Sequence, residues 1–129
     1  MPITALYASL LALIFLVLSV RVIGLRRVVR IGLGDGGDVA LRRVRVHANF
    51  AEYVPLCLIL IGLAESLRAP PVLLHGLGGL LLAARISHAY GVSRQPETFA
   101  WRVSGMVGTL TVLGLAVGVC LYSAARSVG

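Results

Sequence analysis

Apolar residues gather into four long stretches with short polar segments between them. The four stretches cover approximately residues 2–23, 39–67, 72–91 and 98–125. Each is long enough to cross about 30 Å of hydrocarbon as a helix. Pro70 and Pro71 end the second stretch, because proline cannot continue a helix. The pattern predicts an all-α integral membrane protein, a bundle of four transmembrane helices forming a single domain over residues 1–129.

The first stretch is predicted to be a mature helix rather than a signal peptide. It carries no charge before Arg21, so its basic residues follow the apolar run instead of preceding it. Composition agrees with a membrane protein. Of 129 residues, 58% are hydrophobic and 13% are charged, whereas a soluble domain carries about a quarter charged residues. The basic excess is made of arginine, but this hydropathy excludes a nucleic-acid-binding protein.

Other motifs are assigned no chemistry. Cys57 and Cys120 lie in separate apolar stretches without CxxC spacing, which predicts core residues rather than a disulfide framework. The three histidines lack the spacing of metal ligands, so no metal site is predicted. Residues 32–37 fit GxGxxG but follow a membrane helix instead of a strand, which predicts a flexible turn. Gly114 and Gly118 form a GxxxG motif, which predicts close helix packing within or between subunits.

The arginines are distributed unequally between the two sides of the predicted bundle. Ten of the twelve lie on the side of the connections that follow the first and third helices, and only Arg68 and Arg126 lie on the other. Because positive residues favour the cytoplasmic side, both termini are expected to be non-cytoplasmic. The polar start of the second helix is expected to face the cytoplasm.

That polar start, RVRVHANFAEYVP at residues 43–55, is the strongest functional signal. At about 100° per residue, its polar side chains fall within a stripe about 100° wide on one helix face. The stripe consists of Arg45, Asn49, Glu52 and Tyr53, with Arg42 beside it. His47 lies on another face. Ionisable groups at membrane depth normally face protein or a water-filled cavity and mark function.

Two interpretations of the stripe remain open. Arg45 and Glu52 could pair with each other and hold helices together. Alternatively, the stripe could bind a small zwitterionic ligand, with Arg45 on a carboxylate and Glu52 on an amino group. Further polar groups lie at the same depth, because Arg85 and His88 are neighbours on the third helix and Arg102 opens the fourth. Arg102 is expected to line the same cavity.

The spacing R-x-x-x-N-x-x-E-x-x-P in RVHANFAEYVP, residues 45–55, resembles the MAPEG family, the membrane-associated proteins in eicosanoid and glutathione metabolism. The chain looks closest to their small bacterial branch. IGLRRVVR, AARISHAYG and WRVSGM, at the ends of the other helices, support the resemblance. It implies a homotrimer in a bacterial inner membrane, with a glutathione site in each cleft between neighbours and open to the cytoplasm.

The resemblance also implies roles for single residues. The glutathione-binding set would be Arg26, Arg45, His47, Asn49, Glu52, Tyr53 and His88, with Arg26 and His47 approaching from the neighbouring subunit. Arg102 matches the arginine that stabilises the glutathione thiolate in the leukotriene-synthase branch, so it would be the catalytic residue. Where the eukaryotic synthases place tyrosines on the third helix, this chain has His88 and Val92. The second substrate is thereby left open.

Three functions follow as hypotheses. The first is a membrane glutathione S-transferase or peroxidase that uses glutathione as a co-substrate and attacks a hydrophobic electrophile with the thiolate. The second is a protein of the same fold that binds another thiol or a lipid without catalysis. The third is a small four-span transporter, which is disfavoured because such exporters need a carboxylate in the first span, and this one has no charge before Arg21.

Overall fold

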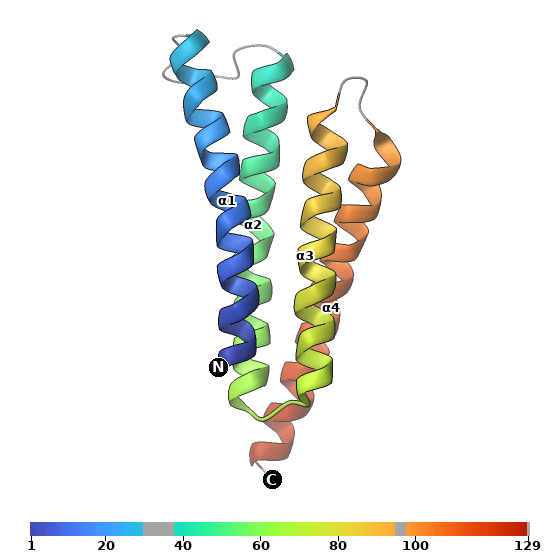
Figure 1. The fold of residues 1–129 in the computed structure, drawn as a ribbon. Coiled ribbons are helices and arrows are strands. Elements are labelled where there is room, and N and C mark those ends of the chain that lie inside the picture. The colour runs from blue at the N-terminus through green and yellow to red at the C-terminus, as the bar shows by residue number, and fades with distance from the viewer. Residues whose placement is uncertain (30–37, 95–97, 129) are drawn as a thin grey trace.

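The computed structural model contains four long helices and describes residues 1–29, 38–94 and 98–128. The helices are α1 (Pro2–Val29), α2 (Asp38–Ser66), α3 (Pro71–Ser93) and α4 (Phe99–Val128). All four are long and apolar enough to cross a membrane, which confirms the predicted fold class. They run alternately up and down, so that both termini and the α2–α3 turn lie at one end (Figure 1). The glycine-rich turn predicted at residues 32–37 lies outside the described residues.

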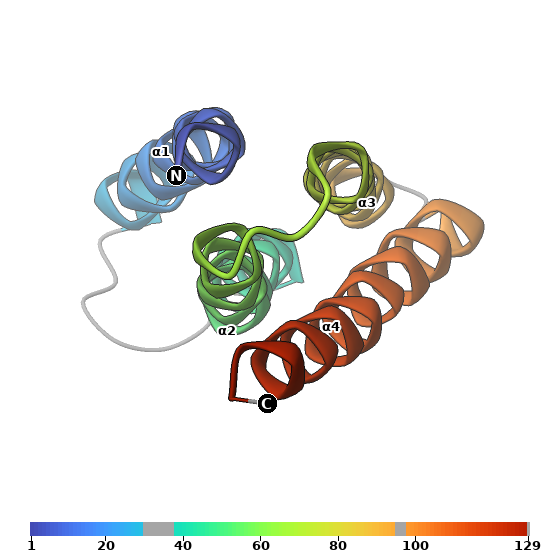
Figure 2. The same ribbon diagram turned by 90° about the horizontal axis from the view of Figure 1, so that it is seen from below.

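The helices form an open bundle with α2 and α3 at its centre. Each of these two contacts the other three helices, whereas α1 and α4 make no contact with each other within the described residues. Seen from below, α1 and α4 lie on opposite flanks of the central pair (Figure 2). The two central helices carry the polar stripe and the buried Arg85 and His88, whereas the buried Thr109 and Ser123 lie on α4. Large apolar side chains are exposed on all four helices. This is the distribution expected when the outer surface faces lipid.

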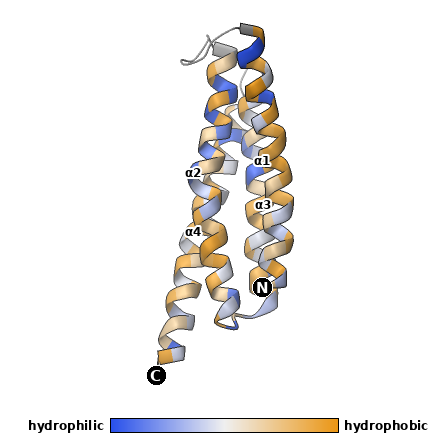
Figure 3. Ribbon diagram, turned by 90° about the vertical axis from the view of Figure 1, so that its left-hand side faces the viewer, coloured by the Kyte–Doolittle hydropathy of each residue, from blue (hydrophilic) through white to orange (hydrophobic). Residues whose placement is uncertain are grey.

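Hydrophilic residues are concentrated at the end of the bundle away from the termini, called here the pocket end (Figure 3). The end with both termini is called the termini end. Between them the interior is apolar, and fully buried side chains include Leu11, Ile61, Leu74, Leu81 and Val112. This apolar interior packs the helices together, and separate polar contacts join them at several levels, among them Ser19 with His47 and Arg85 with Asn49.

Glycines bring α3 and α4 together at the pocket end. A Cβ atom added to Gly105 would lie 2.5 Å from the His88 amide nitrogen and 2.6 Å from the Ala84 carbonyl oxygen, so only glycine fits there. Gly91 meets the backbone of Trp101 and Arg102 in the same way. This close approach sets the start of α4 beside the end of α3.

The predicted GxxxG motif is not a packing site within this chain. A Cβ atom added to Gly114 or to Gly118 would meet nothing within 4 Å. The two glycines instead lie in open space on α4, because α4 packs on α3 through Gly105 and Gly108, nearer the pocket end. Packing of the motif against another subunit stays a prediction.

The termini end is organised by two local structures. The Glu65 carboxylate, near the end of α2, accepts hydrogen bonds from the Ile3 amide at 3.0 Å and the Thr4 amide at 2.8 Å. The Thr4 hydroxyl donates to it at 2.6 Å. These bonds satisfy orphan amide groups in the first turn of α1 with a carboxylate from another helix.

The second structure is the end of α2, which closes in a Schellman motif. The Arg68 amide donates to the Glu65 carbonyl and the Ala69 amide donates to the Ala64 carbonyl, both at 3.0 Å. Arg68 has a φ of 61°, in the left-handed region. Glycine is the usual residue there, because a Cβ atom strains this conformation. Arginine therefore stands where the backbone favours glycine.

Candidate functional site

A pocket of about 610 Å³ opens between α2, α3 and α4 at the pocket end. This volume is within the range of about 300–1,000 Å³ that small-molecule sites occupy. The lining residues are Leu41, Arg42, Arg45, Val46, Ala48, Asn49, Glu52, His88, Val92 and Arg102. Five of the eight sequence-predicted site residues are therefore brought together: Arg45, Asn49, Glu52, His88 and Arg102.

The periodicity of α2 aims its polar residues into this pocket. Arg45, Asn49 and Glu52 are spaced by four and three residues, so they share one side of the helix. The buried Phe50 and Val54 hold the neighbouring side against the bundle interior. Arg45 and Glu52 are exposed and Asn49 is half-buried, so the polar row is open at both ends and most buried at its centre.

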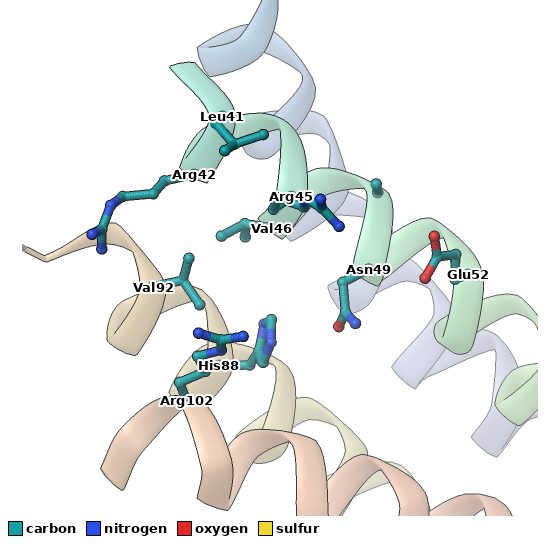
Figure 4. Close-up of a pocket in the computed structure, with 10 residues that line it drawn as sticks. Leu41, Arg42, Arg45, Val46, Asn49, Glu52, His88, Val92 and Arg102 are labelled. Carbon is teal, nitrogen blue, oxygen red and sulfur yellow. The ribbon is translucent and has the colours of Figure 1, made fainter. Parts of the chain in front are cut away.

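The opposite wall comes from α3 and α4. His88 and Val92 are one turn apart on α3, and Arg102 is in the first turn of α4. Arg102 and His88 lie side by side, across the pocket from Arg45 and Asn49 (Figure 4). Because Gly91 contacts the backbone at Trp101 and Arg102, the glycine packing of α3 on α4 positions the Arg102 side chain at the pocket.

Behind this pocket, Arg85 of α3 is fully buried. Its Nη1 atom donates to Asn49 Oδ1 at 2.9 Å and to Thr109 Oγ1 at 3.4 Å. Its Nη2 atom lies 3.5 Å from His88 Nδ1, and its Cζ atom lies 5.2 Å from the centre of the Phe50 ring. Its Nε atom has no hydrogen-bond partner. No carboxylate among the described residues pairs with this buried cation.

The guanidinium of Arg85 fixes what the pocket wall offers to a ligand. A guanidinium only donates, so Asn49 Oδ1 is held toward Arg85 and the Asn49 amide NH₂ remains as the donor. That NH₂ has only a weak acceptor, the Met106 sulfur at 3.8 Å. By the same reasoning, His88 accepts through Nδ1, which puts the proton of its neutral ring on Nε2.

The pocket has a net positive charge. Three arginines and one glutamate line it, and the cation of Arg85 lies directly behind the wall. The pocket therefore favours a ligand with more negative than positive groups, which places its positive group near Glu52. Within the residues that the structure describes, no cluster of histidine, cysteine, aspartate and glutamate could hold a metal ion.

Comparison with known proteins identifies the family of the chain. The family model described as "MAPEG family" matches residues 4–122, which is nearly the whole chain. The chain belongs to the MAPEG family. Inner membrane protein YecN of Escherichia coli strain K12 is 39% identical over 116 residues, covering 89% of this chain and 87% of YecN. The protein of the same name from E. coli O6:H1 strain CFT073 gives the same values.

Three residues that the MAPEG resemblance singled out lie elsewhere in this chain. His47 faces α1, where its Nε2 atom lies 3.0 Å from Ser19 Oγ and its ring stacks on Phe15 with centroids 4.6 Å apart. Tyr53 is half-buried on α2 and does not line the pocket. Arg26 is in the last turn of α1, and none of the described residues of α1 lines the pocket.

The structure also adds residues to this pocket that the sequence did not assign. Arg42 lines the pocket, and the helical wheel had placed it beside the polar stripe. Arg85 holds the wall from behind. An arginine deep in an apolar helix, three residues before a histidine, was the available signal. The sequence carried no such signal for Thr109, because a lone threonine in a membrane helix is common.

Proposed function

We propose that this MAPEG protein binds glutathione in the α2–α3–α4 pocket and acts as a glutathione S-transferase or peroxidase on a hydrophobic electrophile. The observation that carries the proposal is the charge pattern, with three arginines and one glutamate around a volume suited to a small peptide. Glutathione has two carboxylates and one ammonium group, so its charges complement this set. Family membership supports a glutathione-related role.

The polar groups are matched to the parts of the ligand by their chemistry. Arg45 and Arg42 would pair with carboxylates, and Glu52 with the ammonium group. The Asn49 NH₂, freed by the bond of its oxygen to Arg85, would donate to a peptide carbonyl. His88 would donate from Nε2 on the other wall. This arrangement leaves Arg102 beside His88 for the remaining polar group, the cysteine sulfur.

Arg102 would act by stabilising the thiolate. A free thiol has a pKa near 8.5, so only a few per cent is ionised at neutral pH, and the thiolate is the nucleophile. A nearby guanidinium lowers the pKa of a thiol, because it favours the charged form. In a conjugation, the thiol proton passes to water, the sulfur forms a bond to an electrophilic carbon, and the leaving group departs with its electron pair.

The proposed assembly and orientation follow from charge and exposure. The arginine distribution supports a pocket open to the cytoplasm and termini on the other side of a bacterial inner membrane, the compartment that the name of YecN states. A homotrimer would bring a neighbour's α1 to the pocket, and Arg26 is exposed on the last turn of that helix. His47 would join it only if its contact with Ser19 is exchanged for one with the ligand. A hydrophobic second substrate would enter from the lipid.

The first test is an ultraviolet difference spectrum of detergent-purified protein mixed with glutathione at neutral pH. We expect a thiolate absorption band in the wild type, and a loss of most of that band in Arg102→Gln. Arg94→Gln is the matched control, because Arg94 packs on Tyr90 and does not line the pocket. The proposal fails if the wild type gives no band and binds no glutathione by equilibrium dialysis. Binding without a band, and without turnover of a panel of electrophiles, would favour a non-catalytic protein.

A further inference from the structure

A second pocket, of about 770 Å³, lies at the termini end, far from the proposed glutathione site (Figure 1). It is bounded by the α2–α3 turn, the start of α3 and the second half of α4. The residues that matter for its chemistry are Arg68, Leu73, Gly114, Leu115, Gly118 and Arg126. It is called here the arginine groove.

The groove collects both arginines of its end of the molecule. The sequence pattern assigns ten of the twelve arginines to the side of the pocket end, and the remaining two, Arg68 and Arg126, line this one groove. Both are exposed, and neither pairs with a carboxylate of the described residues. Glu65, the acidic residue beside the turn, is already engaged by the first turn of α1. Two positive charges therefore line the groove without a carboxylate partner among the described residues.

A second observation at the groove is the backbone conformation of Arg68. Arg68 occupies the left-handed position of the Schellman motif, where a glycine would make the same backbone bonds without strain. A strained residue of this kind is an outlier from which a functional hypothesis is properly drawn. Compared with a glycine at this position, Arg68 adds a positive charge, which lies on the turn directly beside the groove.

The floor of the groove is apolar and open. Gly114 and Gly118 lie one turn apart on α4, and a Cβ atom on either would meet nothing within 4 Å. Leu73 and Leu115 complete the apolar surface. Because this part of α4 belongs to a helix long and apolar enough to cross a membrane, the floor suits an apolar group such as a lipid chain. The groove thus joins a cationic head region to a slot for a hydrocarbon chain.

We infer that the arginine groove binds an anionic glycerophospholipid, with its phosphate between Arg68 and Arg126 and an acyl chain against Gly114 and Gly118. Arginine suits a phosphate because its planar fork can donate two parallel hydrogen bonds. A second copy of the chain is the competing occupant, since GxxxG motifs pair membrane helices. Parallel pairing through this motif would bring two copies of Arg126 together, and their like charges would repel. The inference does not depend on the proposed function.

The test is native mass spectrometry of the full chain, released from detergent in the presence of equal amounts of palmitoyl-oleoyl phosphatidylglycerol and phosphatidylcholine. We expect the wild type to retain phosphatidylglycerol at least fivefold over phosphatidylcholine. The double variant Arg68→Gln/Arg126→Gln should lose this preference. Gly118→Leu, whose Cβ atom would meet nothing within 4 Å, should fill the floor and lose retention of both lipids.

Matched controls are available in the same chain. Arg21→Gln removes an exposed arginine of α1, and Gly24→Leu fills another open glycine of that helix. Both should behave as the wild type. Arg68→Gly should weaken retention of phosphatidylglycerol and at the same time raise the melting temperature, because it relieves the left-handed strain. A variant that merely unfolds cannot give that pair of results.

Three results would overturn the inference. One is an unchanged lipid preference in the double arginine variant. Another is a change of oligomeric mass in Gly118→Leu, which would identify a second copy of the chain as the occupant. The third is displacement of the retained lipid by soluble glycerophosphoglycerol at equal concentration, which would make the groove a site for a free phosphate ester rather than for a membrane lipid.

Discussion

Replacing Arg85 with methionine should separate the stability of the bundle from its affinity for glutathione. Arg85 is fully buried in α3, and its Nε atom has no partner. It nevertheless donates to Asn49 Oδ1 at 2.9 Å. Methionine has a similar length and no charge, and its sulfur would keep a favourable contact with the Phe50 ring. The variant therefore removes the cation while leaving the interior filled.

Two opposing terms set the expected change in unfolding free energy. The bonds to Asn49 and Thr109 are hydrogen bonds from a charged group, each contributing about 1.5–3 kcal/mol, with the 3.4 Å bond at the low end. Against this, an arginine within a membrane helix costs about 2.5–3.5 kcal/mol. Its unpartnered Nε–H adds a desolvation cost of about 1–3 kcal/mol. The terms nearly cancel, so Arg85→Met should unfold within about 2 kcal/mol of the wild type.

The affinity for glutathione has no such pair of opposing terms. Without Arg85, the Asn49 amide can rotate and present its oxygen to the ligand, and the pocket wall loses a positive charge. We expect the Kd for glutathione to rise about tenfold or more, since about 1.4 kcal/mol corresponds to a factor of ten. Calorimetric titration measures the affinity, and denaturant unfolding in detergent measures the stability. Arg85→Lys, which keeps the charge but not the fork, should fall between the two.

The reverse result would refute this reasoning. If Arg85→Met unfolds more than about 4 kcal/mol more easily and what remains folded binds glutathione as tightly as the wild type, Arg85 is a structural residue only. If the wild type itself binds no glutathione, the proposed function fails first, and the stability measurement still decides whether the buried charge is costly.

Further predictions concern other contacts. Glu65→Gln should lower the unfolding free energy, because one amide oxygen cannot replace a carboxylate that accepts three hydrogen bonds; an unchanged denaturation midpoint would contradict this. Gly105→Val should separate α3 from α4 and cost about 2 kcal/mol or more, whereas Gly24→Ala should be neutral or slightly stabilising, as thermal melting can measure. Arg45→Ala and Glu52→Gln should each raise the Kd for glutathione about tenfold by calorimetry, and equal affinities in both variants and the wild type would exclude this pocket as the site.

The positions of the pocket residues on α2 could be predicted from the sequence, because helical periodicity is a local property. Arg45, Asn49 and Glu52 had to share a face once the segment was recognised as a helix. The pocket end could also be predicted, because the arginines mark the ends of the apolar stretches. Neither inference requires knowing which helix lies next to which.

The features that the sequence did not specify depend on neighbouring helices. The helical wheel put His47 on another face, but only the packing of α1 shows that this face meets Ser19 and Phe15. The burial of Arg85 depends on the rotation of α3 between α2 and α4, which no local pattern specifies. Likewise, the small residues at Gly114 and Gly118 predict a close approach without specifying the partner, and among the residues that the structure describes none approaches them.

The carboxylate of Glu65 has a consequence for the order in which the protein is made. The first turn of α1 obtains its hydrogen-bond acceptor from a residue about sixty positions later, at the far end of α2. During synthesis, these first amide groups of α1 therefore lack their carboxylate acceptor, and rely on water, until the second helix has been translated. The first two helices should accordingly enter the membrane as a hairpin, and a chain halted between residues 30 and 60 should hold α1 less firmly than one that has reached the α2–α3 turn.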